Sequence, residues 1–413
     1  MRIALLAYHF APDPAIGAVR PTNWAEWLSE SHDVTVVTRK GTSTPDAGSS
    51  VSVIRPRSRC IEIVDRLQAA RVRRRVSNAS RQQPATLQRP VELCPTGALT
   101  YRMPCLYDLW ARAAYRSLCH IRPDVVIATH SPYISLVVAA LYAARHRNTK
   151  LWLDFRDMWT YGHTTRGLPI LSTIERVIER RALRQATVVT TVSERLCENL
   201  ARRSGVCRPR LVYNSPAPAG AMFTGHRPSG RPLTLCYTGN IYPWQDITPL
   251  FRLLRELMTT SGITPADVRV QVASRLPGDV VATAARLGVS AFLDYQGCLS
   301  RQDCITMQRD ADVLVVMESA APEADGVLTG KVFEYLATTK PLLLLGPGPQ
   351  SELYRLIDRH DRLIPLEQVR QAVERRRLPF ARRPVDYSAI ARSQLLDCLE
   401  SLASKPGLHG QAA

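Results

Sequence analysis

The stretch GVLTGKVFEYLATTKPLLLLGPG, residues 326–348, places a glycine, a lysine and a glutamate directly before a strongly apolar run. Such a cluster either caps an ordinary helix or holds a charged group. Capping explains Thr329 and Gly330 at a helix start. It does not explain Lys331, because the positive end of the helix dipole disfavours a cation unless an anion binds there. Glu334 follows Gly330 by one turn, so both lie on the same face of the predicted helix.

Strand ends in the N-terminal half provide further candidates. Gly17 follows the first strand and a Pro-rich turn, where a glycine lets the backbone approach a ligand; a tight turn is the simpler alternative. His130 directly follows the strand DVVIAT, at the edge where open α/β sheets bind ligands, although a single histidine is often structural. Asp154, Arg156 and Asp157 lie at the equivalent end of the next strand, with a structural ion pair as the alternative.

The elements that position these residues alternate between apolar strands and amphipathic helices. The first set of predicted strands is 2–10, 33–41, 124–132, 150–160 and 187–193, with helices at 19–31, 107–121, 133–147, 172–186 and 194–204. After a predicted linker at 214–232, rich in Pro, Gly, Ser and Ala, a second set of strands follows at 233–242, 268–274, 292–299, 311–318 and 341–348. This alternation predicts an α/β fold with two Rossmann-like domains.

We place the first domain at 1–215, with an Arg-rich insertion at about 45–105, and the second at 216–385. The remaining residues, 386–413, contain a further predicted helix. A length of 413 residues exceeds what one hydrophobic core usually supports, and 45% apolar residues suffice for two cores.

The charge favours an anionic partner. Lys and Arg number 54 against 36 Asp and Glu, which gives a net charge of +18. Arginines concentrate at 54–90 and 370–384, where a solvated basic surface is the alternative to a binding role. The sequence has no recognition-helix, zinc-finger or RNP-type pattern, so an anionic membrane surface or a phosphorylated substrate is favoured over nucleic acid.

Cysteine spacing and hydropathy limit the cofactor and the location. The 10 cysteines are scattered without C-x-x-C or a His/Cys cluster, so we expect reduced thiols and no metal. No apolar run reaches the roughly 18 residues that span a bilayer. The N-terminal stretch MRIALLAYHFAPDP is too short in its apolar part, and lacks the cleavage site, for a signal peptide. We therefore expect a cytoplasmic protein, with a peripheral position on the inner face of the cell membrane as the option that its basic charge leaves open.

The ordered set YHFAPDPAIGAVRPTNWAEWL, PDVVIATHSP, LDFRDMWT, VVTTVSERL, CYTGNIY and GVLTGKVFEYLATTKPLLLLG resembles the family 4 type of glycosyltransferases with the GT-B fold. More narrowly, it is similar to the bacterial branch that builds exopolysaccharide or other surface glycans. The resemblance covers nearly the whole chain outside about 45–105, and GKVFEYLATTKP is its most specific element. It implies a retaining, hexosyltransferase-like enzyme that needs no metal and works in a cleft between an acceptor-side N-terminal domain and a donor-binding C-terminal domain. The donor is a nucleotide-sugar, and the acceptor is a glycan, lipid-linked or small-molecule hydroxyl. The C-terminal helix would cross back to the first domain.

The resemblance also implies roles for individual residues. Donor-binding residues would be Gly17, Gly239, Asn240, Arg275, Thr329, Gly330, Lys331 and Glu334, and catalytic residues would be His130, Arg156 and Asp157. Lys331 and the helix start would stabilise the diphosphate, whose negative charge grows as the glycosidic bond breaks. Glu334 would accept both ribose hydroxyls, and His130 matches a histidine that contacts the donor sugar in relatives.

Two positions depart from the family pattern. Relatives carry a second glutamate eight residues before Glu334, where this chain has Gly326; Glu323 and Asp325 lie nearby. The usual basic pair after the first strand of the C-terminal domain is absent from GNIYPWQDI, and Arg275 is the candidate replacement.

The mechanism that we expect is a front-face displacement in which the leaving phosphate helps to deprotonate the acceptor, since no paired-carboxylate pattern demands a protein nucleophile. Two alternatives remain open: a nucleotide-sugar epimerase on the same fold, and a non-catalytic glycan-assembly partner, which Gly326 and the missing basic pair favour. A nicotinamide-dependent dehydrogenase ranks below both. It would need a G-x-G-x-x-G motif and an acidic residue after the second strand, which instead ends in Arg39 and Lys40.

Overall fold

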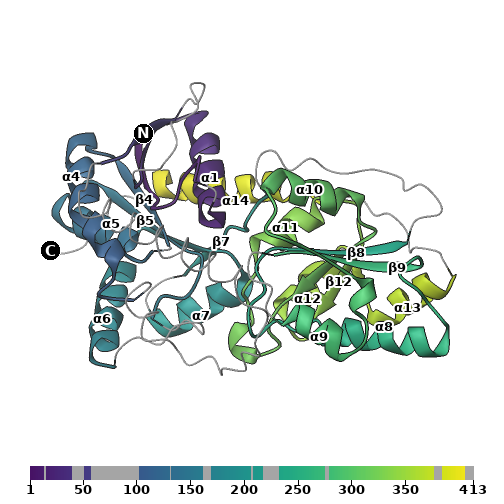
Figure 1. The fold of residues 1–413 in the computed structure, drawn as a ribbon. Helices are drawn as coiled ribbons and strands as arrows, with labels where there is room; N and C mark the ends of the chain where they lie inside the picture. The colour runs from purple at the N-terminus through teal and green to yellow at the C-terminus, as the bar shows by residue number, and fades with distance from the viewer. Residues whose placement is uncertain are drawn as a thin grey trace. The chain divides into compact units, whose positions relative to one another are not determined.

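The computed structural model divides the chain into two compact units, Met1–Ala217 with Ser388–Ala413, and Pro218–Tyr387 (Figure 1). The structure describes residues 1–13, 15–39, 51–56, 102–130, 132–160, 169–205, 208–216, 232–274, 279–375 and 384–404. The second unit is therefore continuous in sequence, whereas the first is built from both ends of the chain.

The first unit contains a sheet of seven strands in the order β3-β2-β1-β4-β5-β6-β7, and every recorded pairing is parallel. The strands are β1 (Arg2–Leu6), β2 (Asp33–Val37), β3 (Ser52–Ile54), β4 (Val125–Thr129), β5 (Lys150–Phe155), β6 (Val188–Thr191) and β7 (Arg210–Leu211). The α-helices are α1 (Val19–Ser29), α4 (Ala111–Ile121), α5 (Ile134–Arg145), α6 (Pro169–Gln185), α7 (Glu194–Ser204) and α14 (Tyr387–Ser404). β3 lies inside the range predicted as an insertion, so the sheet extends further than the sequence indicated.

Both faces of this sheet are buried, as expected for parallel strands. Side chains of β1 alternate between them: Ala4 and Leu6 join a core with α4, α5 and α6, while Ile3 and Leu5 join a core with α1 and α14. α14 contributes five buried residues to the second of these cores, namely Ala391, Leu395, Cys398, Leu399 and Leu402.

The second unit repeats the arrangement with six parallel strands in the order β10-β9-β8-β11-β12-β13. The strands are β8 (Leu233–Thr238), β9 (Val268–Ala273), β10 (Leu293–Gly297), β11 (Val313–Met317), β12 (Leu342–Leu345) and β13 (Leu363–Ile364). The α-helices are α8 (Thr248–Thr260), α9 (Val280–Arg286), α10 (Arg301–Asp310), α11 (Gly330–Leu336), α12 (Glu352–Asp358) and α13 (Leu366–Arg375).

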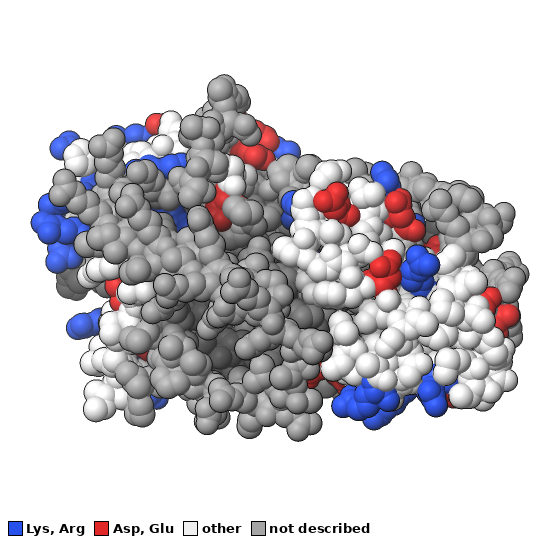
Figure 2. Space-filling model, viewed as in Figure 1, with Lys and Arg blue, Asp and Glu red and all other residues white. Residues whose placement is uncertain are grey.

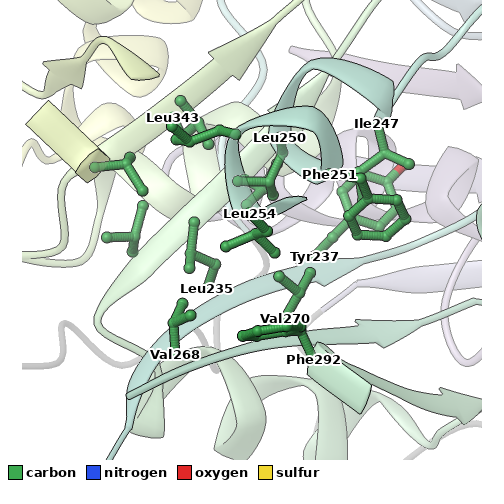
Figure 3. Packing of buried hydrophobic residues seen from close by; sticks show 14 of the residues in the cluster. Leu235, Tyr237, Ile247, Leu250, Phe251, Leu254, Val268, Val270, Phe292 and Leu343 are labelled. Carbon is green, nitrogen blue, oxygen red and sulfur yellow. The ribbon is translucent and has the colours of Figure 1, made fainter. Parts of the chain in front are cut away.

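Large apolar side chains fill one side of this second sheet. Leu235 and Tyr237 of β8 pack with Val270 of β9 against Leu250 and Phe251 of α8 (Figure 3). α9 and α13 contribute to the same core. The predicted α/β fold with two helix-flanked sheets is thus confirmed. Within the described ranges, the structure has no helix long and apolar enough to cross a membrane.

Candidate functional site

The strand order reverses at two places, between β1 and β4 in the first unit and between β8 and β11 in the second. In open parallel sheets, ligands bind at such switch points, beyond the carboxyl ends of the strands. Gly17 and His130 follow β1 and β4, while Gly239 and Glu318 follow β8 and β11. Each unit therefore presents its own polar strand edge.

In the first unit, the structure brings together Gly17, His130 and Arg156. The Arg156 guanidinium donates from Nη1 to the carbonyl of Gly17 at 2.8 Å and from Nε to the carbonyl of His130. A Cβ atom on Gly17 would lie only 3.3 Å from Nη2 of Arg156, so the glycine leaves room for the guanidinium. Burial lowers the pKa of Arg156, and the charges of Asp157 and Asp154 oppose that shift. One arginine thus connects the loops that follow β1 and β4.

His130 is held in the neutral form. Its side chain is buried, and its Nδ1 has no hydrogen-bond partner among the described residues. Burial lowers the pKa of His130 to about 4; the charge of Asp157 acts against this shift, and that of Arg156 reinforces it. Asp157 itself is exposed. A neutral imidazole with an unused nitrogen can exchange a hydrogen bond with a hydroxyl group.

Asp154, by contrast, has a structural role. Both of its oxygens bind the buried Arg20, at 2.9 Å from Nε and 2.8 Å from Nη2, and also accept hydrogen bonds from Thr129 and Thr190. Arg20 donates further to the carbonyls of Val212 and Tyr213. The structural ion pair that the sequence left open is thus present, with Arg20 as its cation.

A second histidine stands beside Gly17. His9 Nδ1 lies 2.8 Å from a carboxylate oxygen of Asp13, which also accepts from Arg39 at 3.1 Å. Burial raises the pKa of Asp13. Hydrogen bonds from His9 and from the Ala15 N–H, together with the charge of Arg39, outweigh burial and hold the pKa of Asp13 well below its usual range. Sequence reasoning missed this pair; its only signal was the four-residue spacing of His9 and Asp13 directly after the first strand.

In the second unit, Lys331 and Gly239 are neighbours. The Lys331 ammonium lies 3.8 Å from the centre of the Tyr237 ring. Gly239 has a φ of +122°, and a Cβ atom there would lie 2.8 Å from Nζ of Lys331. The backbone conformation requires a glycine here, and its missing side chain leaves space that the lysine ammonium occupies.

Glu318, which sequence reasoning also missed, is the main carboxylate near Lys331. Burial lowers the pKa of Lys331 to about 8, and Glu318 opposes this shift more strongly than Glu334 does. Burial likewise raises the pKa of Glu318 to about 6, and the charge of Lys331 is the largest influence that opposes this shift. The position of Lys331 at a helix start predicted an anion nearby, and the carboxylate of Glu318 is part of that negative charge. The sequence did contain one signal for Glu318, because this carboxylate directly follows a central strand.

Glu334 projects from the first turns of α11 and is already paired. Its Oε1 accepts from Arg301 at 2.8 Å; its side chain is 19% exposed, against 47% for Arg301. α11 begins at Gly330 as predicted, with Thr329 as the N-cap residue in extended conformation. It is only seven residues long, so its dipole is small.

Of the remaining candidate residues, the structure describes Asn240, Gly326 and Asp325 but not Arg275. Asn240 is exposed, and its carbonyl accepts from the Tyr237 hydroxyl at 2.7 Å. Gly326 is buried with a φ of +92°. Asp325 caps the turn into α12 by accepting from the N–H of Glu352. Arg275 lies outside the described residues, as does most of the Arg-rich insertion.

No cluster of three or more His, Cys, Asp or Glu side chains in the described ranges is arranged to hold a metal ion.

The comparisons with known proteins agree on the fold. Sucrose-phosphate synthase from Thermosynechococcus elongatus is 15% identical and matches with a TM-score of 0.60, covering 98% of this chain and 97% of that chain. Anabaena Alr3699/HepE in complex with UDP is 16% identical, with a TM-score of 0.51 and 98% of each chain covered. The catalytic domain of starch synthase IV from Arabidopsis thaliana, bound to ADP and acarbose, is 11% identical, with a TM-score of 0.52, covering 97% and 99%.

These likenesses show that the chain has the GT-B fold. Residues 17–217 match the family model described as the glycosyl transferase 4-like domain, which lies within the first unit. This part of the chain is therefore similar to a glycosyl transferase 4-like domain, and the likeness of the whole chain to the solved structures is one of fold. A comparison with curated proteins finds no match.

Proposed function

We propose that this protein transfers a sugar from a nucleotide-sugar donor to an acceptor hydroxyl, and that the donor binds at the β8/β11 edge of the second unit. The observation that carries the proposal is the contact between Lys331 and Gly239, in which a half-buried ammonium lies against a glycine at the start of a turn. Such a turn lets a diphosphate approach both the charge and the backbone N–H groups.

The chemistry follows from the charges of this edge. As the glycosidic bond breaks, negative charge grows on the leaving diphosphate, and a positioned ammonium stabilises it most in a partly dehydrated site. Lys331 supplies that charge, and its pKa of about 8 keeps it mostly protonated at neutral pH. Glu334 accepts the ribose hydroxyls once Arg301, the more exposed partner of their ion pair, releases it.

The polar edge of the first unit serves the reacting groups in this proposal. The neutral His130 contacts the donor sugar, Arg156 fixes the loop that carries Gly17, and the exposed Asp157 lies within electrostatic reach of His130. The transfer is a retaining front-face displacement without a metal. Two solved structures with a similar fold, one in complex with UDP and one bound to ADP and acarbose, support a nucleotide-sugar donor and a glycan-like acceptor.

The biological setting is part of the same proposal. We place the protein in the cytoplasm, at the inner face of the membrane, in the synthesis of exopolysaccharide or another surface glycan. The net charge of +18 supports contact with an anionic surface. The motifs that resemble the surface-glycan branch support the pathway class.

Donor binding tests the proposal directly. A panel of nucleotide-sugars is screened by thermal shift, because a ligand that binds only the folded state raises the melting temperature. Lys331→Ala and Glu334→Gln should each abolish the shift, or lower donor affinity by roughly a hundredfold, because each removes a charge-assisted contact. Lys340→Ala, in the same unit, is the matched control and should behave like the natural protein. Full donor affinity and turnover in the Lys331 variant would refute the assignment.

Product analysis separates the alternatives. Incubation with donor alone yields an isomerised nucleotide-sugar if the protein is an epimerase. A transferase gives slow donor hydrolysis, or transfer once an acceptor is added. A donor that binds but is neither hydrolysed nor transferred would indicate a non-catalytic partner.

A further inference from the structure

Helix α6 exposes an unusual face. Ile170, Ile174 and Val177 follow one another at helical spacing and are 79%, 49% and 51% exposed. Arg181 and Arg184 continue the same face for the next two turns, and both are exposed. Neither arginine forms an ion pair with a carboxylate among the described residues. The helix thus presents apolar side chains over its first half and unpaired positive charge over its second.

The acidic residues of α6 are turned inward. Glu175 is fully buried and binds Arg102 at 2.7 Å, and Glu179 is buried against Thr160. The exposed side chains of α6 are Ile170, Thr173, Ile174, Arg176, Val177, Arg180, Arg181, Arg184 and Gln185. None of them carries a negative charge, and apart from Thr173 and Gln185 they are apolar or basic. In Figure 2, Lys and Arg side chains gather at the upper left of the view, over α4 and α5, and a smaller blue area lies lower along the same edge.

We propose that this face of α6 docks on a bilayer that contains anionic phospholipid. A helix with isoleucine and valine beside arginines lies in the plane of a membrane interface, with the apolar side chains entering the acyl boundary. Arginines then reach the headgroup phosphates while their methylene chains stay in the apolar layer. The charge pattern opposes self-association, because an isologous contact between two copies would bring arginines of the same face together.

The inference rests on the proposed location at a membrane but not on the sugar-transfer reaction. The Arg-rich stretch 54–90, which the sequence suggested as a docking surface, lies mostly outside the described residues and stays a separate prediction. The test of the α6 surface needs neither donor nor acceptor.

Vesicle flotation of the full chain tests the surface, with vesicles of phosphatidylglycerol mixed with phosphatidylcholine compared to phosphatidylcholine alone. The natural protein should float with the anionic vesicles only. The double variants Ile174→Asp with Val177→Asp, and Arg181→Glu with Arg184→Glu, should each raise the lipid concentration for half-binding by roughly tenfold or more. All four positions are exposed, so the variants should keep the melting temperature of the natural protein.

Matched controls lie on the second unit: Val281→Asp, at a valine that is 45% exposed, and Arg252→Glu, at an exposed arginine. Both should bind like the natural protein. Unchanged binding by either α6 variant overturns the assignment of the surface, while leaving the membrane location of the proposed function intact. Absence of binding to anionic vesicles overturns both. A dimer of the natural protein that the Ile174→Asp, Val177→Asp variant converts to a monomer would instead make α6 a self-association face.

Discussion

At the scale of single residues, the charge of Lys331 depends on burial and on nearby carboxylates, which shift its pKa in opposite directions. Burial lowers its pKa to about 8, and Glu318 limits the shift. Glu318, with its pKa raised by burial to about 6, is still ionised at neutral pH. Both groups are therefore charged under ordinary conditions, and the lysine ammonium lies against the face of Tyr237.

Gly239→Ala should weaken donor binding as well as the fold. The new methyl group would lie 2.8 Å from Nζ of Lys331 and displace the ammonium, so donor affinity should fall roughly tenfold. The φ of +122° lies outside the left-handed helical region, so an alanine there adds a strain on the order of 1 to 3 kcal/mol to the folded state. Gly262→Ala is the matched control, because Gly262 also has a positive φ but open space around it. Both variants should melt earlier, and only Gly239→Ala should lose donor affinity in calorimetry; equal affinities would contradict the role of the contact.

The sequence identified those site residues that directly follow predicted strands or strand-end turns, because such positions are recognisable without a structure. Gly17, His130 and Arg156 were predicted at one edge and lie together there. Glu318 and the His9–Asp13 pair were missed, since their significance depends on partners distant in sequence or on a spacing common in any protein. The cation that replaces the missing basic pair stays a prediction.

At the scale of elements, α6 separates its charges between two faces. Arginines lie outside, and Glu175 and Glu179 lie inside. Burial raises the pKa of Glu179 to about 7; hydrogen bonds with Thr160 and the charge of Arg102 oppose the shift, while Glu175 reinforces it. The inner face therefore carries a carboxyl group that changes its charge near neutral pH.

This position predicts a pH-dependent stability. Because the pKa of Glu179 is higher in the folded state than the ordinary value of 4.5, its contribution is complete below about pH 4.5 and is lost as the pH rises through about 7. Glu179→Gln cannot ionise, so it should be more stable than the natural protein at pH 8, by up to ~3 kcal/mol, and similar to it at acidic pH. Denaturant titrations across this range measure the difference. Glu198→Gln, an exposed position on α7, should show no such trend; a difference for Glu179→Gln that is constant with pH would contradict the assignment.

The length of an element decided whether the sequence revealed it. Strands with long apolar runs, such as β4 and β11, were predicted close to their bounds. β7 and β13 have two residues each and β3 has three, which is too short for a period of two to be recognised. These short strands form by pairing at the margins of sheets that longer strands have already built.

At the scale of the whole molecule, the first unit depends on both ends of the chain. α14 buries Leu395, Leu399 and Leu402 in the core that also holds Ile3 and Leu5. The second unit has no such long-range dependence, because it is continuous from Pro218 to Tyr387.

Leu395→Ala should therefore destabilise the first unit, by about 2 to 5 kcal/mol, since the leucine is fully buried. Hydrogen exchange resolved by segment should show faster exchange in β1, β2 and α1, with little change in residues 233–364. Leu257→Ala, at a fully buried leucine of α8, should give the converse pattern. Loss of protection in β8 and β9 of the Leu395 variant would show that the cores are not independent.

The return of the chain through α14 also has a consequence for synthesis. A ribosome releases β1 before the second unit, and the second unit before α14. The second unit can close its core as soon as it has emerged, whereas the first must wait with an incomplete apolar face until α14 follows. The unit whose first strand emerges earlier is thus completed later, and during that interval it is the part that most needs protection from aggregation.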